Sequence, residues 1–185
     1  MLQSAGRLAE AELTYRQALP LYEKLVADYP REPWYHHELA YANWLLGSLL
    51  RNTGRAQEGE KPCRQAVANE EKLMADFPSN ADYRSRLSTF LGELAETLLQ
   101  QEKHAEAAKV AEKMADALRE DANAAQTGAA VLARCVPLAE KDAGLSETQR
   151  KAAAKQYADR AAELTQEAER RSSKEPAAAK QKPKP

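Results

Sequence analysis

The sequence predicts an all-α protein, assembled as a solenoid of antiparallel helix hairpins. Much of its hydrophobic fraction of 43% is alanine, which favours helices, while the β-branched residues that favour strands are few. Apolar residues recur three and four positions apart almost throughout. The stretch that begins at Gly6 returns from Gly54, about 48 residues later, with about fifteen of thirty-five positions identical. A period of this size is typical of repeat arrays.

The first two helices are expected over about 8–28 and 34–52. Pro20 lies among strong helix formers, so we expect it to kink the first helix rather than end it. Pro30 ends that helix, because the residue before a proline avoids the helical conformation. Gly54 closes the second helix, since glycine readily takes the left-handed conformation that follows a helix end.

The next three helices are expected over about 56–76, 81–101 and 104–119. Pro78 stops the first of these, for the same reason as Pro30. Asn80, or the serine before it, is expected to cap the helix that follows, because a short polar side chain can accept from its free N–H groups.

The last two helices are expected over about 122–141 and 147–171. Ser146 followed by Gln149 resembles a capping box and would open the seventh helix. Residues 172–185 have no apolar period and are rich in Pro, Lys and Ala, so they predict a disordered basic tail. One helical repeat domain is therefore expected over 1–171.

Composition and charge restrict the classes of partner. The formal net charge is −1 and both signs are interleaved, which argues against a nucleic-acid interface, because that needs a basic stripe. Cys63 and Cys135 lie far apart in sequence and are interpreted as buried apolar side chains in a reduced, cytoplasmic setting. No apolar run is long enough for membrane insertion, and the first ten residues do not resemble a secretion signal.

The hairpin pattern resembles the tetratricopeptide repeat. In that family the first helix of each hairpin carries Leu-Gly and a bulky residue, and the second carries small residues at its packing points. The matching residues here are Leu46, Gly47, Leu50, Gly59, Cys63 and Ala66. The resemblance implies a right-handed superhelix, in which the first helices line a concave groove that binds a peptide.

The repeat is longer than the common one of about 34 residues, by roughly seven for each helix. Seven residues are close to two turns, so the apolar face keeps its phase. This long form is similar to repeat tracts appended to bacterial Ser/Thr protein kinases and other signalling proteins. The segments that carry this similarity include Tyr29-Pro30 and Phe77-Pro78. The kinase motifs themselves are absent from the sequence.

The sequence predicts no catalytic residue, no cofactor and no metal site. His36 and His37 are adjacent, so on a helix they point about 100° apart and cannot bind one ion from the same face. His104 stands alone in the sequence. An enzyme of an unrecognised kind would depend on the cluster of His36, His37 and Glu38.

A stripe of aromatic and polar residues follows the 3-4 spacing of one helix face. It contains Trp34, His37, Tyr41, Trp44, Ser48 and Arg51, with Asn52 beside it. The resemblance places this stripe on the groove, opposite Thr89 and Glu96 of the next first helix. Two interpretations stay open: the aromatic residues contact a ligand, as at many binding hot spots, or Trp34 and Trp44 pack on the first helix.

The preferred functional hypothesis is a non-catalytic module that binds a protein or peptide segment. Tyr41 and Trp44 would contact it, and Arg51 would pair with one of its carboxylates. The alternative is a structural segment without a peptide ligand, which forms a homodimer through the open face of the first helix.

Overall fold

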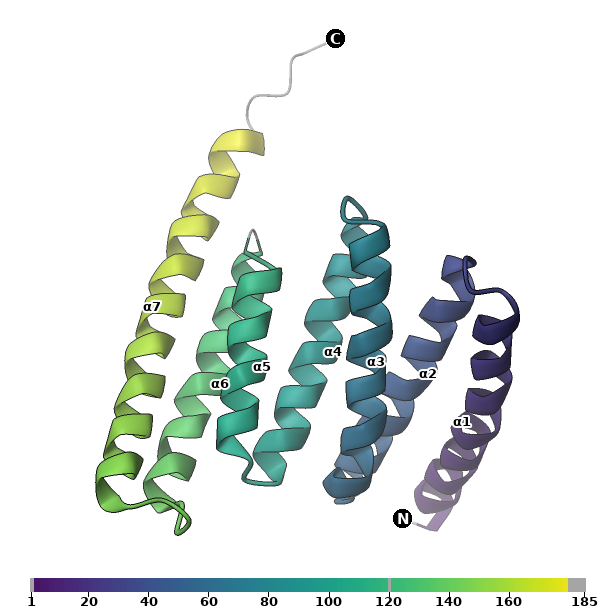
Figure 1. Cartoon of the computed structure of the whole chain (residues 1–185), viewed down its shortest axis with the longest axis horizontal. Helices are drawn as coiled ribbons and strands as arrows, with labels where there is room; N and C mark the ends of the chain where they lie inside the picture. The colour runs from purple at the N-terminus through teal and green to yellow at the C-terminus, as the bar shows by residue number, and fades with distance from the viewer. Residues whose placement is uncertain (1, 120, 180–185) are drawn as a thin grey trace. The chain divides into compact units, whose positions relative to one another are not determined.

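The computed structural model describes residues 2–119 and 121–179, and over these residues it contains seven helices and no strand (Figure 1). The helices are α1 (Leu2–Asp28), α2 (Pro33–Asn52), α3 (Ala56–Asp76), α4 (Ala81–Gln100), α5 (His104–Ala117), α6 (Ala122–Lys141) and α7 (Glu147–Ala179). The predicted all-α class, with seven helices, is confirmed.

Two helices extend beyond their expected ranges. α1 begins at Leu2, and Pro20 lies inside it without ending it. α7 continues to Ala179, whereas a disordered tail was expected from residue 172. Lys, Glu and Ala are common in that stretch, and their helix propensity opposes an early stop. The rest of the predicted tail, 180–185, lies outside the described residues.

Several helix ends follow the local signals in the sequence. Gly54 has a φ of 80°, the left-handed conformation predicted after α2. The Asn80 side chain accepts from the N–H of Asp82 over 2.9 Å at the start of α4. At the start of α7, Gln149 N–H donates to Ser146 Oγ over 3.3 Å and Ser146 N–H donates to Gln149 Oε1 over 2.9 Å. The predicted capping box is therefore present.

The turn between hairpins repeats along the chain. The backbone N–H groups of Tyr29, Phe77 and Leu118 each donate to the carbonyl four residues earlier, over 2.9, 2.9 and 3.1 Å. The Tyr29 and Tyr35 rings lie 5.7 Å apart, and the Phe77 and Tyr83 rings, at the same places one repeat later, lie 5.9 Å apart. The sequence repeat is thus also a repeat of contacts.

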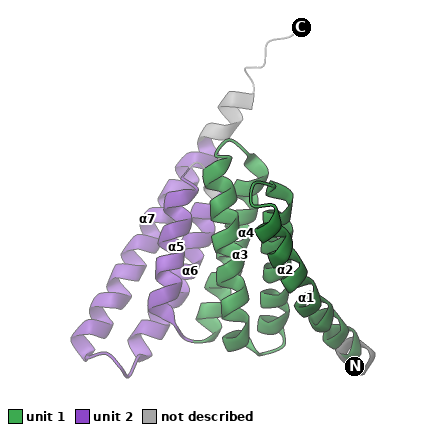
Figure 2. Cartoon of the chain, turned by 45° about the vertical axis from the view of Figure 1, so that its right-hand side comes forward, with its two compact units in different colours: residues 1–101 green, residues 102–185 purple. Residues whose placement is uncertain are grey.

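The chain forms two compact units, residues 1–101 and residues 102–185, whereas one domain was expected over 1–171 (Figure 2). In unit 1, α2 packs on α1, α3 and α4, and α3 also packs on α4. In unit 2, α6 packs on both α5 and α7.

α2 and α3 approach each other closely in unit 1, at Gly47, Gly59 and Cys63. A Cβ atom at Gly47 would lie 2.4 Å from Cys63 Sγ, and one at Gly59 would lie 2.8 Å from the Gly47 carbonyl oxygen. Cys63 itself is buried, with its sulfur 3.6 Å from Thr97 Oγ1. Only glycine allows the two backbones to come this close.

In unit 2, a buried histidine joins three segments. His104 Nε2 lies 3.0 Å from Asp142 Oδ2, and His104 Nδ1 lies 3.1 Å from the Tyr157 hydroxyl. The imidazole N–H donates to the carboxylate, so the other ring nitrogen accepts from the phenol. These bonds connect the start of α5, the turn after α6 and the middle of α7.

Candidate functional site

Four side chains of α2 form a continuous ladder of rings. Successive ring centroids of Trp34, His37, Tyr41 and Trp44 lie 5.9, 6.0 and 5.3 Å apart. The ladder continues to α4, where the Phe90 ring stacks on Trp44 at 5.7 Å. The spacing along α2 places these residues on one face, as predicted from the sequence.

The ladder is exposed at two of its members. Trp34 is 60% exposed and Tyr41 is 42% exposed, while Trp44 is half-buried against Phe90. Gly92 of α4 has open space around it, because no atom lies within 4 Å of a Cβ built there. We call the surface of Trp34, His37, Tyr41 and Trp44 the aromatic face. The sequence predicts that Thr89 and Gly92 of α4 lie opposite it.

Arg51 is already paired with a carboxylate of its own chain. Its Nε donates to Glu93 Oε1 over 2.5 Å, and its Nη2 donates to Glu93 Oε2 over 3.3 Å. The pKa of Arg51 is raised by this bond first, and the charges of Glu93 and Glu96 add to it. A ligand carboxylate would have to displace Glu93, which is itself largely buried.

The remaining predicted residues are held within their own helices. Asn52 Nδ2 donates to Ser48 Oγ over 3.3 Å, and Thr89 Oγ1 donates to the Ser85 carbonyl over 3.2 Å. Asn52 and Thr89 are exposed, whereas Ser48 and Glu96 are half-buried. Their place in a ligand site stays a prediction.

A buried carboxyl group next to the ladder was missed in the sequence. Glu70 of α3 is fully buried, and neither of its oxygens has a hydrogen-bond partner among the described residues. Glu70 Oε2 lies 3.8 Å from His37 Nδ1, and Glu70 Oε1 lies 3.9 Å from Arg86 Nε. Glu70, His37 and Arg86 therefore form one cluster, contributed by three helices.

Burial dominates the electrostatics of this cluster. Removal from water raises the pKa of Glu70 to about 7, although the charge of Arg86 opposes the shift. Burial also lowers the pKa of His37, and the Arg86 charge lowers it further. Arg86 Nη1 lies within 3.2 Å of both His37 ring nitrogens, a contact that favours a neutral imidazole.

The repeat contains a signal that could have revealed this cluster. One repeat before Glu70 and Arg86, the equivalent residues are Tyr22 and Glu38. Tyr22 donates its hydroxyl to Glu38 Oε2 over 3.2 Å, so these two positions also interact in the first repeat. Both members of the pair differ between the two repeats: Glu70 replaces the tyrosine, and Arg86 replaces the glutamate.

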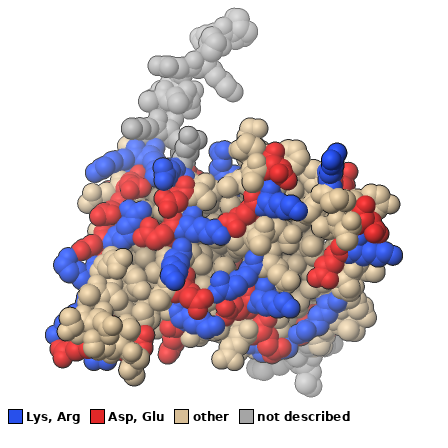
Figure 3. Space-filling model, in the orientation of Figure 1, with Lys and Arg blue, Asp and Glu red and all other residues tan. Residues whose placement is uncertain are grey.

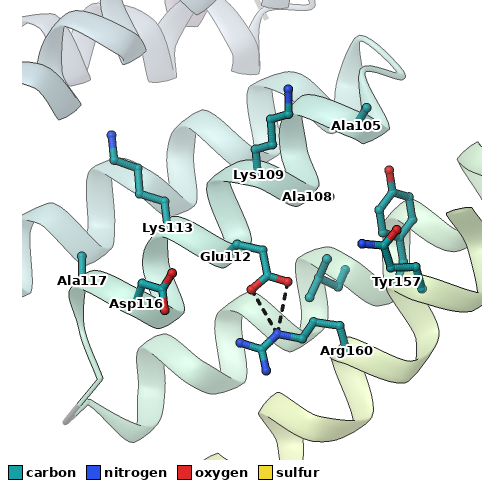
Figure 4. Close-up of a pocket in the computed structure, with 11 residues that line it drawn as sticks. Ala105, Ala108, Lys109, Glu112, Lys113, Asp116, Ala117, Tyr157 and Arg160 are labelled. Carbon is teal, nitrogen blue, oxygen red and sulfur yellow. Dashed lines mark hydrogen bonds and ion pairs between the residues drawn. The ribbon is translucent and has the colours of Figure 1, made fainter.

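A groove lies in unit 2, between α5 and α7, with a volume of about 790 Å³ (Figure 4). Arg160 Nε donates to both carboxylate oxygens of Glu112 there, over 3.0 and 3.1 Å. Lys109 and Lys113 point away from this pair (Figure 4). The hydroxyl of Tyr157 is bonded to His104, so the groups lining this groove offer mixed charges rather than a defined ligand set.

No group of three or more potential metal ligands occurs among the described residues. None of the helices in the described part of the chain is long and apolar enough to cross a bilayer. Burial raises the pKa values of Cys63 and Cys135 to about 11, so both are protonated thiols at neutral pH.

The surface carries both signs of charge. Basic and acidic side chains alternate over the visible face, without a large patch of one sign (Figure 3). On α1, Leu13 and Leu21 are 56% and 66% exposed. The predicted homodimer through α1 stays a prediction.

Comparisons with models of protein families, with curated proteins and with solved structures find no match.

Proposed function

We propose that this chain is a non-catalytic interaction module that binds a peptide segment of a partner protein on the aromatic face. The observation that carries the proposal is the ring ladder of α2, whose Trp34 and Tyr41 side chains are exposed to water by 60% and 42%. Aromatic rings gain several kcal/mol when a partner covers them, roughly 25 cal/mol for each Å². Such rings are common at binding hot spots.

The shape of α4 supports the same surface. The open space at Gly92 leaves room for a ligand side chain beside the ladder. The rigid backing of the face, where Trp44 stacks on Phe90, lowers the entropy that binding would cost.

A tetratricopeptide-like array is part of this proposal. It is supported by the recurring turn at Tyr29, Phe77 and Leu118 and by the glycine contact between α2 and α3. Its place in a bacterial signalling protein, such as a Ser/Thr kinase, is an extension of the sequence resemblance.

The first prediction concerns binding through the aromatic face. Peptides selected from a displayed random library on the intact chain should bind Tyr41→Ala at least tenfold more weakly, because truncation of a hot-spot ring costs about 2 kcal/mol or more. Gly92→Leu should weaken the same peptides, because its side chain fills the open space. The measurement is fluorescence anisotropy of labelled peptides.

Phe77→Ala is the matched control. Phe77 is 42% exposed, as Tyr41 is, but it lies at the end of α3, and its ring contacts Tyr83 rather than a ring of the ladder. It should change affinity less than twofold. Selected peptides that bind Tyr41→Ala and Gly92→Leu as tightly as the unchanged chain would refute the aromatic face as the binding site.

A further inference from the structure

Arg86 differs from two other arginines of unit 1, Arg51 and Arg55, in its distance to carboxylates. Arg51 and Arg55 donate to carboxylate oxygens over 2.5 and 2.7 Å. The carboxylate oxygens nearest to Arg86, those of Glu70 and Asp82, lie 3.9 and 4.0 Å away, beyond hydrogen-bond distance. The guanidinium contacts the His37 ring through Nη1, donates through Nε to the Asp82 carbonyl over 3.4 Å and lies 5.4 Å from the centre of the Tyr83 ring. Its charge therefore has no carboxylate of the chain within hydrogen-bond distance, and a ligand could supply one.

The cluster presents its basic groups outward and its acidic group inward. The Arg86 side chain is 30% exposed and that of His37 is 15% exposed, whereas Glu70 beneath them is fully buried. A ligand that arrives at the aromatic face therefore meets a guanidinium and an imidazole first. Charge complementarity favours an anionic group, and a carboxylate matches the planar guanidinium.

The position of His37 indicates which carboxylate fits. Its ring lies between Trp34 and Tyr41 in the ladder, so apolar contacts are available on both sides of the cluster. An acidic side chain inside a peptide, flanked by apolar residues, satisfies both conditions. A carboxylate at the end of a peptide would use only one side of the ladder.

The charged groups around Glu70 affect how tightly a ligand carboxylate can bind. α2 contributes His37 to the cluster, with Glu38 close to it. α4 contributes Arg86, with Asp82 close to it. An ionised Glu70 would lie beneath the carboxylate of the ligand and repel it. A protonated Glu70 removes that repulsion and frees the Arg86 guanidinium to turn outward.

We infer that Arg86 and His37 bind an Asp or Glu side chain of a peptide ligand, and that Glu70 takes up a proton when the ligand binds. This inference rests on the proposed function of the aromatic face, and names its ligand as an acidic side chain between apolar ones. The affinity for the ligand then falls as the pH rises, because Glu70 is ionised in a larger fraction of the free chains and must take up a proton before the ligand binds.

Three short probes test the ligand class. Acetyl-Phe-Glu-Phe-amide carries the acidic side chain, acetyl-Phe-Gln-Phe-amide is its neutral match, and acetyl-Phe-Gln-Phe has only a terminal carboxylate. Binding is followed at pH 6 and pH 8 by the fluorescence of the two tryptophans of the chain. At pH 6 the Glu probe should bind about tenfold more tightly than either Gln probe, and at pH 8 this advantage should shrink severalfold.

Two variants identify the groups responsible. Arg86→Gln should abolish the advantage of the Glu probe at both pH values. Glu70→Gln, which has the same shape without the charge, should keep the full advantage at pH 8. Circular dichroism checks that both variants stay helical, and calorimetry in buffers of different ionisation enthalpy should detect proton uptake with the unchanged chain only.

Each other result decides against part of the inference. Equal affinity for the Glu and Gln amides overturns the acidic-ligand inference but leaves the aromatic face as a binding surface. Tighter binding of the probe with the free terminus shows that the site takes a terminal carboxylate instead. A pH dependence that persists in Glu70→Gln excludes Glu70 as the proton acceptor. Binding of no probe at pH 6 counts against both the inference and the proposed function.

Discussion

Glu70 makes the folded chain sensitive to pH. A carboxylate without hydrogen bonds in the interior is expensive to ionise, and Arg86 at 3.9 Å offsets only part of that cost. The pKa of the group rises from its ordinary 4.5 to about 7 in the folded chain. Between these two values the folded state holds a proton that the unfolded state has released. Folding is therefore favoured at low pH, and this contribution is lost as the pH rises towards 7.

Replacement of the Glu70 carboxyl by an amide should remove its pH-dependent contribution to the free energy of unfolding. Glu70→Gln should become more stable relative to the unchanged chain as the pH rises from about 4.5 to 7, by roughly 3 kcal/mol in total. Urea unfolding of both proteins at pH 4.5, 6 and 8 measures this difference. A difference that stays constant over this range would show that Glu70 titrates normally in the folded chain.

The sequence predicted one part of the candidate site and not the other. The 3-4 spacing that joins Trp34 to Trp44 is a property of one helix, so it could be predicted from periodicity. The approach of Glu70 to His37 and Arg86 depends on how three helices pack, which periodicity does not specify. Arg51 illustrates the same limit, because its partner Glu93 belongs to another helix.

The individual helices were the most predictable level of the structure. Proline, glycine and capping residues gave the ends of α2, α3, α4 and α6 to within about one residue, because these signals act through local backbone chemistry. α7 was less predictable, since alanine and lysine favour a helix even where no apolar stripe requires one.

The contact between α2 and α3 distinguishes two helical glycines. Gly47→Ala should destabilise the chain by about 1–3 kcal/mol, because its Cβ would lie 2.4 Å from Cys63 Sγ, closer than atoms can pack. Gly92→Ala is the matched control, because open space surrounds that position. It should stabilise the chain by up to about 1 kcal/mol, since alanine favours the helix.

Chemical denaturation of the two glycine variants measures both effects. The double variant Gly47→Ala, Cys63→Ala should recover part of the loss, because it removes the sulfur that the new methyl group meets. Equal effects of Gly47→Ala and Gly92→Ala would mean that helix propensity, and not the close approach of α2 and α3, decides the result.

Across the chain, the period of the repeat changes between its copies. The equivalent turn residues Tyr29 and Phe77 are 48 positions apart, whereas Phe77 and Leu118 are 41 apart. α5 is correspondingly short, with 14 residues against 21 in α3. The lost seven residues are close to two turns, so the apolar face keeps its phase. The first two copies of the repeat share one constant period, from which the two units, residues 1–101 and 102–185, could not be predicted.

The two units should respond separately to damage in their own cores. His104→Ala removes the bonds to Asp142 and Tyr157 that join α5, the turn after α6 and α7, and it should cost about 2–3 kcal/mol. In repeat structures a local loss is felt mainly by neighbouring elements. Hydrogen exchange should therefore accelerate in α5, α6 and α7, while the buried amides of α2 and α3 keep their rates.

Tyr157→Phe is the control for this prediction, because it removes only the phenol oxygen and should cost about 1 kcal/mol. In the His104→Ala background the same change should have almost no effect, since the bond is already lost. Gly47→Ala should give the reverse pattern, with faster exchange in α2 and α3 and unchanged rates in α6 and α7. Uniform acceleration over all seven helices in either variant would show that the chain unfolds as one cooperative body.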